Sequence, residues 1–265
     1  MYGVGFGIGA IGATTVLNSG GGNFDADAQS FFTASGVTNA TQKNAINQFV
    51  LDLKSNSLWT KQKEIHLYFL GDSSKNSYNL KNPSTFTNTF SSGWTYDSSG
   101  ATPNGTSAYC QSGFNPSTHC SANSISFGVY FNTLPTKSTS ANGVFVAGYN
   151  TLYRASLTGN YTYWNGGEIL RSTSSGDNNG FQQVSRYNTT QQLRKHKNNA
   201  TETITDNYTS LPNAVFYKGV ANGLSQYEDR RFTLTYISDG LTSSEMDKMY
   251  TCVQTLMTTL GINVW

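Results

Sequence analysis

The feature that most constrains this chain is a succession of short β-prone runs, separated by turn-forming residues, from residue 85 onward. The runs cover residues 124–131, 143–149, 160–164, 181–187, 191–196, 201–205, 214–219 and 231–237. Between them lie pairs such as Asn142-Gly143 and Asn198-Asn199, which favour tight turns. Short strands at this spacing predict a mostly β fold, an antiparallel jelly-roll sandwich.

Composition excludes several other classes of protein. Charged residues make up 12% of the chain and aromatic residues 13%, whereas disordered chains are rich in charge and poor in aromatics. The formal net charge of +2 is too small for the concentrated basic face of a nucleic-acid-binding protein. No apolar run approaches the roughly 18 residues of a membrane span. We therefore expect a folded domain with an uncharged polar surface, and neither nucleic acid nor membrane as a partner.

The first 23 residues form a glycine-rich segment that differs from the rest of the chain. Its apolar residues Val4, Phe6, Ile8 and Ile11 stand among glycines, which are poor helix formers. The segment lacks the basic start of a signal peptide. We interpret residues 1–23 as a retained, extended arm that anchors the chain by packing against another protein.

Helical patterns flank the β-rich part on both sides. Acidic residues at 25 and 27 and the glycine at 36 suit the two ends of a first helix. A second helix has its apolar stripe at Ile46, Phe49, Val50 and Leu53, and residues 65–70 follow as an expected strand. Near the C-terminus a capping box at 242–245 opens a helix that packs either on its own sandwich or on a sister subunit. The predicted organisation is an arm at 1–23, a helical collar or linker at 24–84 and a lectin-like sandwich at 85–265.

Motifs that would indicate catalysis or metal binding are missing from the sequence. Two carboxylates spaced i, i+2 on a strand would suit glycoside hydrolysis, but the adjacent Glu228 and Asp229 are better explained by a solvated turn. The three histidines lie far apart, and the three cysteines include no C-x-x-C pair. We expect no enzymatic activity, no cofactor and no metal, and the sequence leaves open whether Cys110 and Cys120 form a disulfide.

Two surface features are candidates for binding glycans. Tyr161, Tyr163, Trp164 and Asn165 combine aromatic rings, which pack on sugar C–H faces, with an amide that binds hydroxyls. The alternative is that Tyr161 and Tyr163 share a strand face and belong to the core. The basic run at 194–197 is interpreted as a solvated hairpin strand, with anionic glycan binding as the alternative.

Several stretches resemble virion proteins of tailed phages that infect gut Bacteroidota, the crAss-like group among them. They are Gly93-Trp-Thr with Gly100-Ala-Thr-Pro-Asn-Gly-Thr-Ser-Ala-Tyr109, Asn115-Pro-Ser-Thr118, Ser124-Ile-Ser-Phe-Gly-Val-Tyr130, Asp25-Ala-Asp-Ala-Gln29 and Asn79-Leu-Lys-Asn-Pro83. The closing stretch from Ser238-Asp-Gly-Leu-Thr to Met249-Tyr250 is similar to the last strand and helix of laminin-G-like, concanavalin A-like domains.

The resemblance implies a lectin-like sandwich on a virion appendage. The chain would be a head-fibre, tail-fibre or decoration subunit, bound to capsid or tail proteins and to itself as a homo-oligomer, expected to be a trimer. Its role would be adhesion to bacterial or mucus polysaccharide. The resemblance carries over no catalytic residues. The alternatives are a glycan-degrading hydrolase on a concanavalin-like fold and a purely architectural capsid or tail protein.

Overall fold

The computed structural model describes residues 23–134, 136, 142–147, 150–156, 159–164, 167–171, 179–205, 211, 213–221 and 226–264. For the strands between 142 and 171 the description covers the backbone. The predicted arm, with Val4, Phe6, Ile8 and Ile11, lies outside the described residues.

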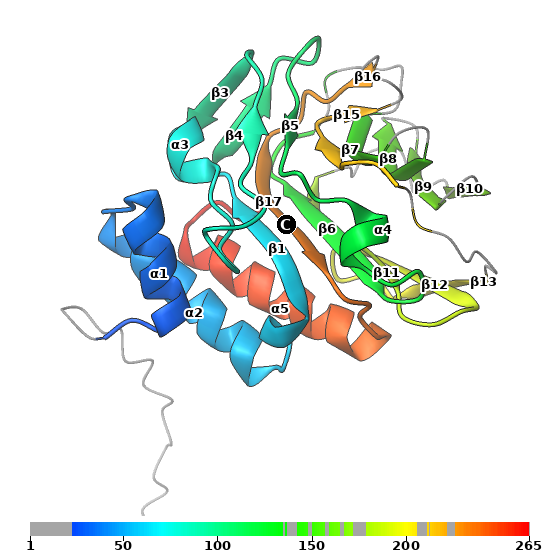
Figure 1. The fold of residues 1–265 in the computed structure, drawn as a ribbon, viewed down its shortest axis with the longest axis horizontal. Helices are drawn as coiled ribbons and strands as arrows, with labels where there is room; N and C mark the ends of the chain where they lie inside the picture. Colours follow the sequence, from blue (N-terminus) through cyan, green and yellow to red (C-terminus); the bar gives the residue numbers. More distant parts are fainter. Residues whose placement is uncertain are drawn as a thin grey trace, which may run out of the picture.

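Two antiparallel sheets form the body of the molecule (Figure 1). In the larger sheet the strand order is β13-β12-β11-β6-β17-β4-β3, and β1 also pairs with β17. Its strands are β1 (Gln62–Leu67), β3 (Trp94–Asp97), β4 (Gly100–Pro103), β6 (Ile125–Phe131), β11 (Gly180–Arg186), β12 (Gln191–His196), β13 (Glu202–Thr205) and β17 (Phe232–Ser238). The predicted antiparallel sandwich is confirmed.

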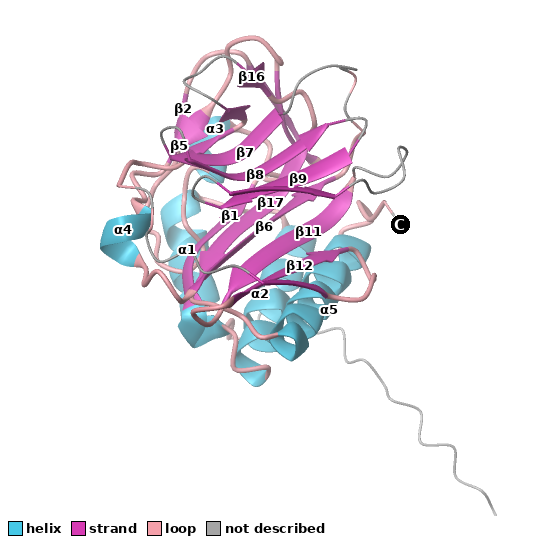
Figure 2. Cartoon of the chain, turned by 90° about the vertical axis from the view of Figure 1, so that its right-hand side faces the viewer, coloured by secondary structure: helices cyan, strands magenta, loops and turns pink. Residues whose placement is uncertain are grey.

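The smaller sheet has the order β10-β9-β8-β7-β14-β5-β2. Its strands are β2 (Thr89–Phe90), β5 (Cys110–Gln111), β7 (Asn142–Ala147), β8 (Asn150–Ser156), β9 (Gly159–Trp164), β10 (Gly167–Arg171) and β14 (Tyr217–Lys218). A separate pair is formed by β15 (Val220–Ala221) and β16 (Gln226–Tyr227). Figure 2 shows this sheet on one face of the larger sheet and the long helices on the other.

The helices are α1 (Ala26–Ser35), α2 (Ala40–Ser55), α3 (Ser73–Asn76), α4 (Pro116–His119) and α5 (Ser243–Thr259), with a 3-10 turn at Trp59–Lys61. Their ends follow the sequence signals. Asp25 caps α1 by accepting from the amide of Asp27, and Gly36 ends it with φ of 69°. Thr242 and Glu245 form the predicted capping box of α5. Among the described helices, none has the length and apolar content to cross a membrane.

Buried side chains form two clusters, one on each face of the larger sheet. The cluster between the sheet and the helices unites α1, α2 and α5 with residues of β1, β6 and β17. The cluster between the two sheets includes Phe127, Val129 and Phe131 of β6. Strand β6 therefore supplies both clusters, because alternate residues of a strand point to opposite faces. The C-terminal helix packs on its own chain, as one of the two sequence interpretations predicted.

Strand β17 departs from the strict alternation of a regular strand. Such alternation would place Phe232, Leu234 and Tyr236 on one face, but Phe232 packs between the sheets while Leu234 and Tyr236 face the helices. The reason is an irregularity in the pairing with β6 between Phe232 and Leu234. Every residue of β17 is buried, including Thr233 and Thr235, because layers cover both faces of the sheet.

Residues 24–84 belong to the same packed body as the sandwich. Strand β1 pairs with β17 over the register from Gln62 opposite Ser238 to Leu67 opposite Leu234. Helices α1 and α2 share one cluster of buried side chains with α5. The segment predicted as a collar thus supplies a strand to the larger sheet and part of the layer that covers it.

Candidate functional site

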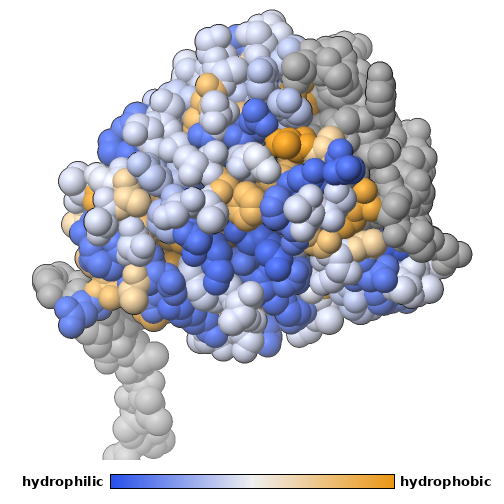
Figure 3. Space-filling view, in the orientation of Figure 1, coloured by the Kyte–Doolittle hydropathy of each residue, from blue (hydrophilic) through white to orange (hydrophobic). Residues whose placement is uncertain are grey.

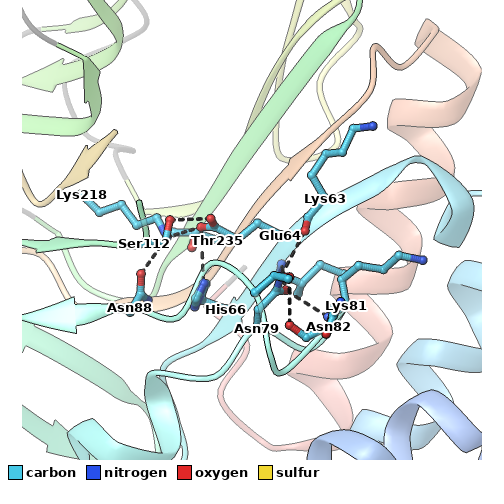
Figure 4. Close-up of polar contacts among 12 residues, drawn as sticks. Lys63, Glu64, His66, Asn79, Lys81, Asn82, Asn88, Ser112, Lys218 and Thr235 are labelled. Atoms are coloured by element: carbon cyan, nitrogen blue, oxygen red, sulfur yellow. Dashed lines mark hydrogen bonds and ion pairs between the residues drawn. The ribbon is translucent and has the colours of Figure 1, made fainter. Parts of the chain in front are cut away.

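Five polar side chains meet between the two sheets (Figure 4). They are Glu64 and His66 of β1, Asn88 before β2, Ser112 after β5 and Lys218 of β14, and we call them the interior polar cluster. Glu64, His66 and Lys218 are 0% exposed, and Asn88 and Ser112 are 4% and 8% exposed. The cluster therefore lies in surroundings from which water is largely excluded.

The register of the smaller sheet brings one side of this cluster together. Lys218 lies opposite Cys110 of β5, and Cys110 lies opposite Phe90 of β2. Residues opposite one another in antiparallel strands share a face, as do residues two apart. Asn88 and Ser112 are each two residues from this row, so they face the same way as Lys218, toward β1.

Lys218 has two partners in the cluster. Its Nζ donates to Glu64 Oε1 and, at 2.9 Å, to Asn88 Oδ1. The second oxygen of the carboxylate, Oε2, accepts from Ser112 Oγ at 2.6 Å. The lysine and the glutamate neutralise one another, which a pair of buried charges requires.

His66 stands beside this ion pair as a neutral base. Burial, and then the positive charge of Lys218, lower the pKa of His66 well below its usual 6.5. Its Nε2 lies 3.4 Å from Glu64 Oε1, but neither ring nitrogen has a hydrogen-bond partner among the described residues. Immediately after β1, the Tyr68 hydroxyl shares a 3.0 Å hydrogen bond with the Thr235 hydroxyl.

The outer edge of β1 is held by the Asn79 side chain together with a 2.8 Å backbone bond from the Leu80 amide to the Ile65 carbonyl. Asn79 Oδ1 accepts from the amides of Ile65 and Lys81 at 2.9 and 3.0 Å. Asn79 Nδ2 donates to the Lys63 carbonyl at 3.1 Å (Figure 4). These bonds satisfy edge groups of β1 and fix its position, and with it the placement of Glu64 and His66.

A second buried ion pair corrects the prediction of a solvated turn at Glu228. This glutamate is 0% exposed and Arg230 is 1% exposed. Arg230 donates through Nε to Oε1 at 2.9 Å and through a terminal nitrogen to Oε2 at 2.7 Å. Its guanidinium carbon lies 3.7 Å from the centre of the Phe131 ring. The polar neighbours of Glu228 in the sequence predict a surface turn, but the bidentate bond and the Phe131 ring allow Glu228 and Arg230 to be buried.

The basic run at 194–197 is also not the solvated strand that was expected. Arg194, Lys195 and His196 are at most 7% exposed. Lys195 Nζ lies 2.7 Å from an Asp247 carboxylate oxygen and 5.7 Å from the centre of the Tyr250 ring, both on α5. Helix α5 therefore covers this part of β12, and Lys195 contributes to the contact between the two layers.

The three cysteines carry free thiols, so Cys110 and Cys120 are not joined in a disulfide. Burial raises the pKa of both thiols to about 12, and they are protonated at neutral pH. Within the described part of the chain, no group of three or more histidine, cysteine or acidic side chains has the arrangement of a metal site.

The predicted glycan-binding residues belong to the smaller sheet. Tyr161, Tyr163 and Trp164 are in β9, where Tyr161 lies opposite Leu170 and Tyr163 opposite Glu168. By strand geometry, positions 161 and 163 share one face of β9 and position 164 belongs to the other. Asn165 lies outside the described residues. The members of the interior polar cluster come from β1, β14 and the segments beside β2 and β5, so β9 supplies none of them.

Sequence reasoning missed the interior polar cluster. Its members are spread from residue 64 to residue 218, and no motif joins them. One local signal was present, because His66 interrupts the apolar run from Ile65 to Leu70 and Glu64 precedes it at the i, i+2 spacing of a strand face. Two polar residues on one face of a buried strand require partners from elsewhere in the fold.

Comparison with known proteins shows a similarity of fold to some solved structures. No family model and no curated protein matches the chain. Among solved structures, domain 4 of the arabinanase AbnA from Geobacillus stearothermophilus, in complex with arabinotriose, has a TM-score of 0.46 at 14% identity, over 72% of this chain and 100% of that domain. Trypanosoma rangeli sialidase has a TM-score of 0.49 at 10% identity, over 81% of this chain and 40% of that one.

The exoplasmic domain of VIP36, bound to calcium and a mannose disaccharide, has a TM-score of 0.40 at 12% identity, over 69% of this chain and 91% of that one. All three scores are below 0.5, and the chain spans less than half of the sialidase. The likeness therefore adds nothing to the evidence for a particular activity.

Proposed function

We propose that this chain is a non-catalytic subunit of a phage virion, anchored by its glycine-rich arm and displaying its β-sandwich for adhesion to glycans. The proposal has three parts that separate experiments test: the sandwich performs no hydrolysis, the smaller sheet binds glycans, and the arm attaches the chain to a particle.

The observation that carries the proposal is the state of the buried carboxylates. Glycoside hydrolysis uses two carboxyl groups that both reach the substrate. In the sandwich, Glu64 is bound by Lys218 and Glu228 by Arg230, and both glutamates are 0% exposed. Each carboxylate is neutralised by a cation and closed off from solvent, which favours a binding or structural role over a catalytic one.

The polar surface of the described residues supports the proposal that the sandwich is displayed to water. Figure 3 shows one face of the molecule as largely polar, with apolar side chains in small separate patches. Among the described residues, the large hydrophobic side chains counted as exposed are Leu51 and Leu134. Isolated exposed apolar residues are normal on a water-facing protein.

Strands β7 to β10 support the adhesion part of the proposal. They form a continuous antiparallel run in the smaller sheet, and β9 contributes Tyr161, Tyr163 and Trp164 to it. Aromatic residues are well suited to contact the apolar faces of sugars. Single sites of this kind bind weakly, and many copies on one particle raise the apparent affinity.

A glycan array probed with the multimerised chain tests adhesion. We expect a set of bound bacterial or mucus-type polysaccharides, and a loss of signal of tenfold or more for Tyr161→Ala or Tyr163→Ala, whose positions share one face of β9. Tyr109→Ala, an aromatic substitution outside β9, is the matched control and should bind as the parent does. Silence across the array would contradict the adhesive role and favour the architectural one. Equal binding by all variants would overturn the assignment of the site to β9.

Particle attachment is tested by comparing the full chain with a chain that begins at residue 23. When both are supplied to particles that lack the protein, we expect the full chain to co-sediment and the shortened chain to remain in the supernatant. Equal occupancy of particles by the two chains would overturn the anchoring role of residues 1–22.

A further inference from the structure

Three members of the interior polar cluster hold the reactants for an amide bond. The Lys218 amine contacts both the Asn88 carboxamide and the Glu64 carboxylate. We propose that Lys218 and Asn88 become joined by an intramolecular isopeptide bond, which the fold itself forms with Glu64 as the proton carrier. This inference does not rest on the proposed function, and its readouts are separate from glycan binding and particle attachment.

Proximity is the first support for this step. Lys218 Nζ lies 2.9 Å from Asn88 Oδ1. Because the carbonyl bond is about 1.2 Å long, the nitrogen lies within about 4 Å of the carbon that it would attack. Both residues are fixed by backbone hydrogen bonds. Lys218 is in β14, and the backbone N–H of Asn88 donates to the Ser77 carbonyl at 2.8 Å. Groups fixed at such range react as if at very high concentration.

The reaction balances without an oxidant or any further reactant. Glu64 takes a proton from the Lys218 ammonium, and the free amine attacks Cγ of Asn88. A bond forms between Nζ and Cγ, and the bond from Cγ to Nδ2 breaks. Glu64 returns its proton to the departing nitrogen, which leaves as ammonia and takes up the remaining proton as ammonium. The carboxylate ends as it began, so Glu64 acts as a general acid and base.

The surroundings favour this proton transfer. In a site that excludes water, moving the proton from lysine to glutamate replaces two buried charges by two neutral groups. Ser112 holds Oε2 of Glu64, which leaves Oε1 directed at the lysine. Asn88 Nδ2, the leaving nitrogen, lies 3.4 Å from the Tyr68 hydroxyl. The nearby Cys110 thiol does not compete as a nucleophile, because burial raises its pKa to about 12.

The bond would brace the smaller sheet. It would tie β14 to the residue before β2, across the intervening strand β5. The joined residues are 130 positions apart in the chain. Closing so long a loop restricts the unfolded chain, and it also prevents β14 and β2 from being pulled apart without breaking a covalent bond.

The test is a tryptic map and an intact mass of the purified full chain. We expect a mass lower by one ammonia than the sequence requires. We also expect a linked species in which peptide 82–137 is joined to peptide 198–230, with no cleavage after Lys218. An intact mass that retains the ammonia, together with separate peptides ending at Lys137 and Lys218, would overturn the proposal and leave an ordinary buried ion pair.

Variants assign the role of Glu64. In Glu64→Gln, which keeps the shape but cannot carry the proton, we expect at least a hundredfold smaller fraction of linked peptide. Glu228→Gln is the matched control, because it removes the other buried glutamate of an ion pair and should leave the link intact. Full linkage in Glu64→Gln would overturn the proton-carrier role. If that variant does not fold, the wild-type map still decides whether the bond exists.

Discussion

At the scale of single residues, two buried glutamates are each paired with a buried cation. Glu64 with Lys218 lies between the sheets, and Glu228 with Arg230 lies against the Phe131 ring. An unpaired charge in either place would have lost its hydration without compensation. The expected consequence is a large cost for removing one partner and a small cost for the same change at the surface.

Arg230→Met removes the cation from the second pair and leaves Glu228 buried and charged. We expect the free energy of unfolding to fall by about 3–5 kcal/mol, measured by urea denaturation. The neighbouring Arg231→Met is the control, since Arg231 and its partner Asp97 are 30% and 51% exposed. Its cost should be about 1 kcal/mol or less. Equal costs for the two variants would contradict the buried-pair account.

His66 makes the stability of the fold depend on pH. Burial and Lys218 lower its pKa in the folded protein, whereas in the unfolded chain it titrates near 6.5. Below that pH the unfolded chain binds a proton that the folded chain does not. The free energy of unfolding should therefore decrease as pH falls below about 6.5, by up to roughly 1.4 kcal/mol per pH unit.

The check is the difference between the pH profiles of the wild type and His66→Gln, each from denaturation at several pH values between neutral and acidic. Other titrating groups are common to both proteins and cancel in the difference. We expect the wild type to lose stability more steeply below about pH 6.5. Parallel profiles would mean that His66 is not held neutral in the folded protein.

At the scale of elements, sequence signals predicted the helices better than the strands. The ends of α1, α2 and α5 are set by local caps, and these are visible in the sequence as Asp25, Gly36, Asn39 and Thr242. Strands β8 and β10 and the short β2 to β5 were not predicted. The short strands have two to four residues, over which periodicity carries little information, and β4 and β5 pair with β17 and β14, which are distant in the chain. Strands β8 and β10 pair with their chain neighbours β7 and β9, but Arg154 and Glu168 interrupt their apolar pattern.

The cap of α5 gives a direct test at this scale. Thr242 Oγ1 accepts from the Glu245 amide, and a Glu245 carboxylate oxygen accepts from the Thr242 amide. Thr242→Ala should lower the free energy of unfolding by about 1 kcal/mol, seen as a lower Tm. Thr255→Ala, in the exposed middle of the same helix, should be neutral or slightly stabilising, because alanine is the better helix former. The same loss in both variants would argue against the cap.

At the scale of the whole molecule, residues 24–84 and the β-rich part form one body. Strand β1 lies beside β17, and Glu64 from β1 is the counter-charge of Lys218 from the smaller sheet. The change in composition near residue 84 predicts a domain boundary there. Composition cannot reveal that a strand on one side of this point pairs with a strand on the other.

A fragment of residues 85–265 should therefore fail to fold alone. It would lack β1, the helices α1 and α2 that cover the larger sheet, and the partner of Lys218. We expect it to lack near-UV circular dichroism and a cooperative thermal transition, whereas a chain beginning at residue 23 should show both. A cooperatively unfolding fragment 85–265 would contradict this view.

The candidate site shows the same limit of sequence reasoning. The β9 aromatics were predicted because they are adjacent in the chain, whereas Glu64, Asn88 and Lys218 meet through the pairing of β14 with β5 and of β5 with β2. That pairing is a property of the folded sheets. The residues of the interior polar cluster are present in the sequence, but their contacts arise only when the two sheets fold together.

Adhesion without catalysis is tested by measuring, on the same samples, how strongly polysaccharides retain the chain and whether the chain hydrolyses them. The purified chain is run by affinity electrophoresis in gels that contain the polysaccharides selected on the array, and reducing ends are assayed in parallel. We expect retarded migration of the chain, with no reducing ends beyond those of a heat-denatured sample. Release of reducing ends by the folded chain, or unretarded migration in every gel, would contradict it.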